Sequence, residues 1–145
     1  MIAVGGDGTA VEKVEDLARP GIQIAIGAES VPVGAYTREV LGRLPTGLEE
    51  EIMANGRSEE PDVKGVVGKL TQGAADAGFV YATDVKAAGD DLRAIELPAD
   101  LDPIATYGAG VVSASEHQDE AQAFVDGLAG GACHDALLRA GFGEP

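Results

Sequence analysis

Hydrophobic and polar positions along the chain follow two alternating periods. Ile22, Ile24 and Ile26 recur at every second residue, which is the period of a strand. After Pro61, the apolar residues of 63–70 recur at i, i+3, i+4 and i+7, which gives a helix one apolar face. Blocks of these two kinds follow one another along the chain.

Clusters of glycine and proline, such as the Arg-Pro-Gly of residues 19–21, separate the blocks. The patterns predict strands at residues 1–4, 22–26, 78–81, 92–97 and 106–112. They predict helices at residues 14–18, 35–44, 48–54, 61–70, 121–128 and 132–140. Alternating strands and helices are typical of an α/β fold, with a largely parallel sheet flanked by helices.

The composition is that of one folded domain. The chain has 145 residues, of which 45% are hydrophobic and 24% charged, enough for one domain and too short for two. No apolar run approaches the roughly 18 residues that a membrane span requires, so we expect no membrane insertion. The net charge of −15 argues against nucleic acid as a partner. The net charge does not exclude a small anion as ligand, since local dipoles can hold one.

Side chains suited to metal binding or catalysis are sparse. Cys133 is the single cysteine, so an internal disulfide is excluded, and His117 and His134 lack a companion cysteine cluster. Asp84 has no paired acid or histidine nearby in the sequence, and no Ser/His/Asp order emerges. We therefore expect no metal site, no catalytic residue and no cofactor.

Two loops have the chemistry of an anion site. Residues 27–34 lead from a strand into a helix, and residues 58–63 open the amphipathic helix. The first N–H groups of a helix have no partner within it, so two helix N-termini could hold an anion without Lys or Arg. From the residues alone, ordinary turns and caps are the simpler interpretation, with Glu59 and Glu60 as solvated charges.

Three separated segments share a pattern with one protein family. Residues 19–27 (Arg-Pro-Gly-Ile-Gln-Ile-Ala-Ile-Gly) and 30–36 (Ser-Val-Pro-Val-Gly-Ala-Tyr) form the first, residues 73–84 the second and residues 120–142 the third. Together they resemble the crossover region with the first anion loop, the most distinctive segment and the C-terminal helical pair of the molybdate-binding proteins of ABC importers. The match covers nearly the whole chain in the right order.

The resemblance implies a type II periplasmic-binding-protein fold, in which two α/β lobes joined by crossover strands close on a tetrahedral dianion. Residues 1–112 would be a single ligand-binding lobe with crossover strands at both ends, and residues 113–145 a helical pair that normally packs on the first lobe. The chain departs from the family in lacking the Ala-Ser-Leu-like motif and the Gly-Ser-rich loop of that first lobe. Tyr107-Gly108 also stands where a Tyr-Pro pair is typical.

The resemblance also implies the ligand groups, which are backbone N–H groups at Val33 and Val63 and the hydroxyl of Tyr81. Neutral donors suit a fully ionised oxyanion, because a protonated one would place an O–H against a donor. From the residues alone, Tyr81 would be a core aromatic with its hydroxyl at the surface. Asp62 is expected to be a helix-terminus charge and not a ligand.

These observations predict a non-enzymatic binding lobe for molybdate or a similar tetrahedral oxyanion, truncated and weak alone, with an ABC permease as partner. The family resemblance implies a periplasmic or extracellular location. A cytoplasmic one follows if Met1 is the native start, since no signal peptide precedes the domain. Apolar stripes in residues 113–145, with Gly108 and Gly110 as a hinge, favour a homodimer. The alternatives are a one-lobe protein-interaction module and, less favoured, a regulator's effector domain, which here lacks any helix-turn-helix.

Overall fold

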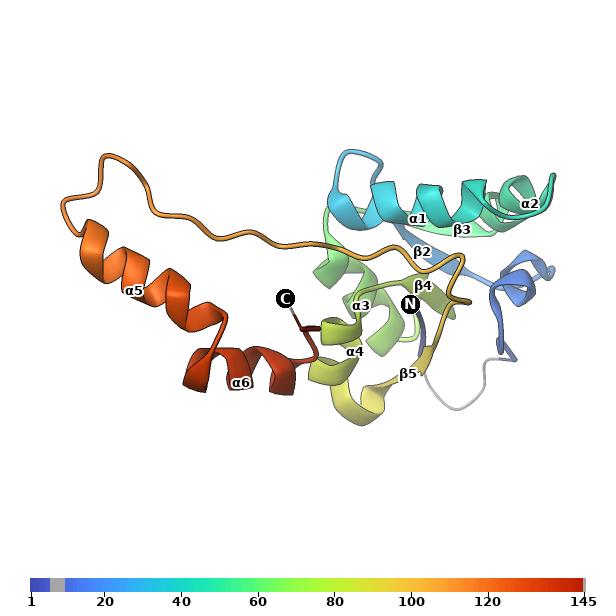
Figure 1. Cartoon of the computed structure of the whole chain (residues 1–145). Coiled ribbons are helices and arrows are strands. Elements are labelled where there is room, and N and C mark those ends of the chain that lie inside the picture. The colour runs from blue at the N-terminus through green and yellow to red at the C-terminus, as the bar shows by residue number, and fades with distance from the viewer. Residues whose placement is uncertain (6–9, 145) are drawn as a thin grey trace. The chain divides into compact units, whose positions relative to one another are not determined.

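The computed structural model describes residues 1–5 and 10–144 of the chain. They divide into two compact units, unit 1 at Met1–Pro103 and unit 2 at Ile104–Pro145, each described here by itself (Figure 1). The strands of unit 1 are β1 (Ile2–Gly5), β2 (Ile24–Gly27), β3 (Gly56–Glu60), β4 (Ala77–Phe79) and β5 (Leu92–Ile95). Its helices are η1 (Val14–Ala18), α1 (Pro32–Gly42), α2 (Leu48–Ala54), α3 (Val63–Thr71), α4 (Ala82–Ala88) and η2 (Gly89–Asp91). Unit 2 contains α5 (Gln118–Leu128) and α6 (Gly131–Ala140).

The sheet of unit 1 has the strand order β3-β2-β4-β1-β5. Strand β2 runs parallel to both β3 and β4, whereas β1 is antiparallel to its neighbours β4 and β5. Strand β5 therefore points the same way as β2, β3 and β4, and β1 alone among these strands is reversed. The predicted α/β fold with a largely parallel sheet is confirmed.

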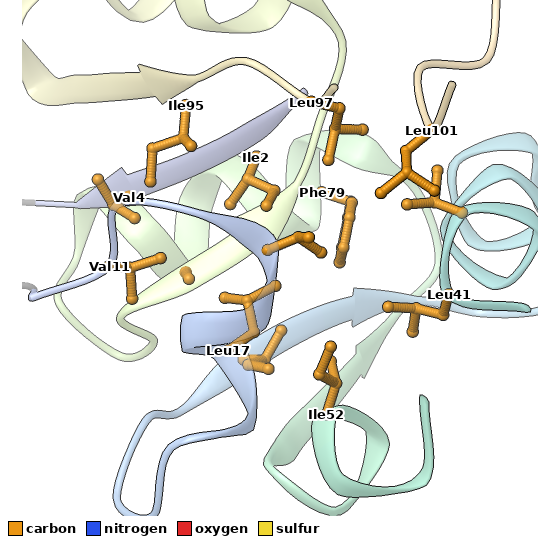
Figure 2. Close-up of a cluster of buried hydrophobic side chains, with 14 of the residues drawn as sticks. Ile2, Val4, Val11, Leu17, Leu41, Ile52, Phe79, Ile95, Leu97 and Leu101 are labelled. Carbon is orange, nitrogen blue, oxygen red and sulfur yellow. The ribbon is translucent and has the colours of Figure 1, made fainter. Parts of the chain in front are cut away.

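One face of the sheet carries its large side chains. Ile2, Val4, Ile24 and Ile26 belong to a buried cluster that also takes in residues of η1, α1 and α2, among them Leu17, Leu41 and Ile52 (Figure 2). In a strand, alternate residues point to opposite faces, so the spacing of these four residues puts them on one side. This cluster is the main core of unit 1.

The opposite face carries small side chains, which lets α3 pack closely. Ala3 and Ala25 alternate with the large residues of the same strands and belong to a second buried cluster with Val66 and Leu70. A Cβ atom added at Gly78 would lie 2.7 Å from Cγ1 of Val66 and 2.9 Å from the carbonyl oxygen of Ala25. The glycine is thus required by the close approach of the helix to the sheet.

Two elements of unit 1 do not show the periodic spacing of apolar residues that predicts strands and helices. Strand β3 reads Gly-Arg-Ser-Glu-Glu and lies at the sheet edge, where Glu60 is its only buried residue. The prediction of a loop at residues 58–63 is therefore wrong in part, because residues 58–60 belong to β3 and only Pro61 and Asp62 separate it from α3. Helix α4 has seven residues and none is buried, so no apolar stripe marks it.

Residues 106–112 were expected to be a strand and have no regular secondary structure. A strand exists only when a neighbour satisfies its backbone groups, and none of the described residues pairs with this segment. Its large apolar residues Tyr107 and Val112 are each 70% exposed. The prediction failed because a β-type sequence does not by itself supply a pairing partner.

In unit 2 the helices α5 and α6 contact each other and bury no residue. Phe124 remains 62% exposed, and the rings of Tyr107 and Phe142 meet edge to face with centroids 5.7 Å apart. Within residues 1–5 and 10–144, no helix has both the length and the apolar character needed to cross a membrane.

Candidate ligand-binding site

Three parallel strands of unit 1 end at the same edge of the sheet. Strands β2, β3 and β4 end at Gly27, Glu60 and Phe79, and each is followed by a short loop and a helix, α1, α3 or α4 (Figure 1). Since the strand order is β3-β2-β4, the three loops are neighbours. Ligands of open α/β sheets bind beyond the carboxyl ends of the strands, so this edge is the candidate site.

Direct contacts hold these loops together. The Ala28 N–H, after β2, donates to the carbonyl oxygen of Glu60, at the end of β3, over 2.8 Å. The rings of Tyr36 in α1 and Tyr81 before α4 lie edge to face, with centroids 6.4 Å apart. The edge is therefore organised by protein contacts alone.

The β2–α1 loop presents two backbone donors. Pro32 is the first residue of α1 and has no N–H, and the first amide bonded within the turn is that of Ala35, which donates to Val31 over 3.0 Å. The N–H groups of Val33 and Gly34 precede that bond, so the helix itself cannot satisfy them. The hydrogen bonds found among the described residues include none donated by either. Val33 is only 4% exposed as a whole residue, so its side chain is packed in the interior and any contact with a ligand would be through its backbone N–H.

The β3–α3 loop presents a second pair of first-turn amides. Asp62 is the N-cap of α3, and its carboxylate accepts a hydrogen bond from the Gly65 N–H over 2.9 Å. This agrees with the expected role of Asp62 as a helix-terminus charge. The amides of Val63 and Lys64 remain as donors without a partner inside the helix.

Glu60 was expected to be a solvated charge, and the structure shows otherwise. It is only 9% exposed, and its carboxylate lies 3.9 Å from the Lys69 ammonium. A Cβ atom at Gly65 would come within 2.7 Å of the same carboxylate. Parallel pairing with β2 at Gly27 draws Glu60 inward, an effect that the local sequence does not indicate.

The β4–α4 loop places Tyr81 as the N-cap of α4, with its side chain partly exposed. The Tyr81 N–H donates to the Asp84 carboxylate over 3.0 Å. Burial raises the pKa of Asp84, and the hydrogen bond from Tyr81 offsets part of that rise. Val33 and Val63, in the first turns of α1 and α3, and Tyr81, the N-cap of α4, thus follow three adjacent strands at one sheet edge.

Arg38 is a residue of this edge that sequence reasoning missed. Its guanidinium Nη1 donates to the carbonyl oxygens of Gly27, over 3.1 Å, and Gly34, over 3.0 Å. The side chain is 24% exposed and also forms ion pairs with Glu29 and Glu59. The available signal was an arginine one helical turn after a loop that ends in glycine.

The predicted ligand groups at this edge, the amides of Val33 and Val63 and the hydroxyl of Tyr81, are neutral hydrogen-bond donors. Backbone amides and a phenol can hold the oxygen atoms of an anion without exchanging a proton with it. Among residues 1–5 and 10–144, no group of three or more His, Cys, Asp or Glu side chains is placed to hold a metal ion.

The comparisons with known proteins agree with this architecture. The family model described as "Bacterial extracellular solute-binding protein" matches residues 1–143, and the chain belongs to that family. Relatives include the molybdate-binding protein ModA of Mycobacterium bovis and of Mycobacterium tuberculosis, each 28% identical over 145 residues. These matches cover 100% of this chain and 53% of the relative, so the chain spans about half the length of the curated relatives it matches.

Solved structures with similar folds cover a comparable share. A substrate-binding domain of an ABC transporter from Clostridium difficile is 27% identical, with a TM-score of 0.79, and the match covers 99% of this chain and 62% of that one. The periplasmic molybdate-binding protein of Azotobacter vinelandii has a TM-score of 0.76 at 24% identity, over 99% of this chain and 64% of that one. The latter likeness shows the fold alone.

Proposed function

We propose that unit 1 is the oxyanion-binding lobe of a solute receptor for molybdate or a similar tetrahedral dianion. The observation that carries the proposal is the position of the first-turn amides of α1 and α3 beside Tyr81 at one sheet edge. The names of the Mycobacterium relatives, which bind molybdate, support the choice of ligand class. In this role Val33, Val63 and Tyr81 are the ligand-binding residues and the lobe catalyses no reaction.

Charge state decides which anions the lobe would accept. Amides and a phenol donate hydrogen bonds, so every oxygen turned toward them must be an acceptor. Molybdate, tungstate and sulfate present only acceptors at neutral pH, whereas hydrogenphosphate carries an O–H that would meet a donor. We expect the fully ionised anions to bind in preference to hydrogenphosphate.

The affinity of this chain alone should be low. In unit 1 the amides of α1 and α3 and one hydroxyl would contact only one side of a tetrahedral ion. We expect molybdate to bind with a Kd in the millimolar range or weaker, which corresponds to about −4 kcal/mol. With this role we propose an ABC permease as the partner and a periplasmic or extracellular site of action.

An NMR titration with sodium molybdate tests the proposal. Molybdate should shift the amide signals of Val33, Gly34 and Val63 in a saturable way, and equal ionic strength of sodium chloride should not. Sulfate serves as the second dianion, and phosphate as the matched anion with a proton. If molybdate leaves all three amides unmoved at tens of millimolar, the proposal is wrong, and micromolar binding by a monomer would refute the half-site interpretation.

The alternative function is a protein-interaction module that binds no anion. The observation that favours it is the exposure of apolar side chains in unit 2, such as Ile104 at 86% and Phe124 at 62%. Patches of this kind mark interaction surfaces. The same titration separates the two functions, because an interaction module predicts no amide shifts at the edge of unit 1.

A further inference from the structure

The guanidinium of Arg38 contacts four groups from the β2–α1 segment and from strand β3. Its Nη1 donates to the carbonyl oxygens of Gly27, the last residue of β2, and of Gly34, in the first turn of α1. Its Nε lies 3.9 Å from the Glu29 carboxylate, in the β2–α1 loop. Its Nη2 lies 3.7 Å from the Glu59 carboxylate, in the neighbouring strand β3.

The loop held by Arg38 is closed tightly on itself. A Cβ atom at Gly34 would lie 1.9 Å from the carbonyl oxygen of Ala28, and one at Gly27 would lie 2.8 Å from the Gly34 nitrogen. The backbone of residues 27 and 28 therefore touches the first turn of α1. The Val33 and Gly34 amides stay in a fixed direction only while this contact persists.

Resting on the proposed function, we propose that Arg38 is the positioning residue of the anion site. It does not contact the anion. It fixes the direction of the Val33 and Gly34 amides through the two carbonyls, and it couples this loop to β3 through Glu59. A planar guanidinium suits this role because its donors have a fixed geometry that a single ammonium cannot reproduce.

The charge of Arg38 has a second consequence for an anion. The side chains of Glu29, in the β2–α1 loop, and Glu59, in β3, are 83% and 65% exposed and lie near the proposed ligand site. Without Arg38 both carboxylates would repel an incoming dianion without the compensating charge of the guanidinium. The residue thus improves anion binding both by geometry and by compensating these charges.

The test compares Arg38→Met with Arg43→Met in the full chain. Arg43 lies at the other end of α1, where its exposed side chain pairs with Glu39, so the control removes a similar cation from the same helix. Molybdate is titrated against both, with the Val33 and Gly34 amide signals as readout. We expect Arg38→Met to weaken binding about tenfold, as loss of a group that orients ligands typically does, and Arg43→Met to bind like the unchanged protein.

Hydrogen exchange without ligand gives a second readout. In Arg38→Met the Ala28 amide, which bonds to Glu60 across the two loops, should exchange faster, while the buried amide of Leu41 should not. Should Arg38→Met fold poorly, Arg38→Lys replaces it and is expected to lose part of the affinity because it keeps only the charge.

The outcomes separate this inference from the function beneath it. If the unchanged protein shows no molybdate-dependent shifts, the proposed function fails and the role of Arg38 falls with it. If the unchanged protein binds and both Arg38 variants bind equally well, only the role of Arg38 is overturned.

Discussion

Replacing Gly34 by alanine tests how tightly the β2–α1 loop is built. A Cβ atom at this position would lie 1.9 Å from the Ala28 carbonyl oxygen and 2.4 Å from that of Gly27, whereas real Cβ atoms essentially never come closer than 3.0 Å. Both obstacles are backbone atoms, so no side-chain rotation can relieve them. The loop must move by more than an ångström.

The expected effect is the balance of two opposing terms. Overpacking of this kind costs about 1 to 3 kcal/mol, and a contact with backbone belongs at the upper end. Alanine is favoured over glycine inside a helix by about 1 kcal/mol, which offsets part of that cost. We therefore expect Gly34→Ala to lower the free energy of unfolding by about 1 to 2 kcal/mol.

Gly42→Ala is the matched control, because Gly42 is the last residue of the same helix and a Cβ atom there meets nothing within 4 Å. It should leave stability unchanged or raise it by up to about 1 kcal/mol. Urea denaturation of both variants gives the comparison, and a molybdate titration of Gly34→Ala should show weaker binding. Equal unfolding free energies for the two variants would refute the tight-loop interpretation.

Other changes test other parts of the molecule. Tyr81→Phe should weaken molybdate binding by about 1 to 2 kcal/mol with little effect on stability, and a lowered melting temperature with unchanged binding would assign its hydroxyl to the core. Burial holds the pKa of Asp84 above its usual value, so the free energy of unfolding falls as pH rises through that pKa and the carboxyl ionises. Asp84→Asn should remove this fall in urea denaturations between pH 3 and 7, and an unchanged pH profile would contradict it. Hydrogen bonds from the Glu12 and Lys13 amides and the Arg19 charge hold the pKa of Asp16 low, so the stability that the Asp16 carboxylate contributes is lost as pH falls through that lowered pKa. Asp16→Asn should reduce the loss of stability below about pH 4 in the same assay, and equal acid profiles of the two proteins would argue against it. The apolar residues of α5 and α6, none of which is buried, should be covered in a homodimer. Light scattering after size exclusion should then give twice the chain mass, and a monomer at high concentration would refute this.

Periodicity was sufficient for the elements that build the core. Strand β2 has a regular alternation and is buried on both faces, helix α3 buries one face of a regular apolar pattern, and glycine or proline marks their boundaries. Strand β3 could not be predicted in this way, because an edge strand needs few apolar residues and its partner supplies the pairing. Helix α4 was missed for a similar reason, being short and nowhere fully buried.

The candidate site was predictable to a different extent at each loop. The loops after β2 and β3 stand out in the sequence as glycine- and proline-containing entries into helices. Tyr81 came only from the resemblance to a known family, since a tyrosine near a strand end is most simply a core residue. The position of Arg38 one helical turn after Gly34 was the sequence signal, but its role could not be assigned, because its partners are backbone carbonyls and carboxylates that only the fold brings to one point.

The proposed site also explains why its side chains carry so little information. Val33 would act through its backbone, while its side chain is buried against Gly27 at the end of β2. The packing is so close that a Cβ atom at Gly27 would lie 2.5 Å from Cγ1 of Val33. Its identity is therefore set by packing against the strand end, not by the ligand. Binding should depend more on residues that fix the backbone, such as Gly34 and Arg38, than on the side chains nearest the ion. A site of this kind is recognised by loop geometry and strand order, because amides are present at every position of the chain and only their direction distinguishes them.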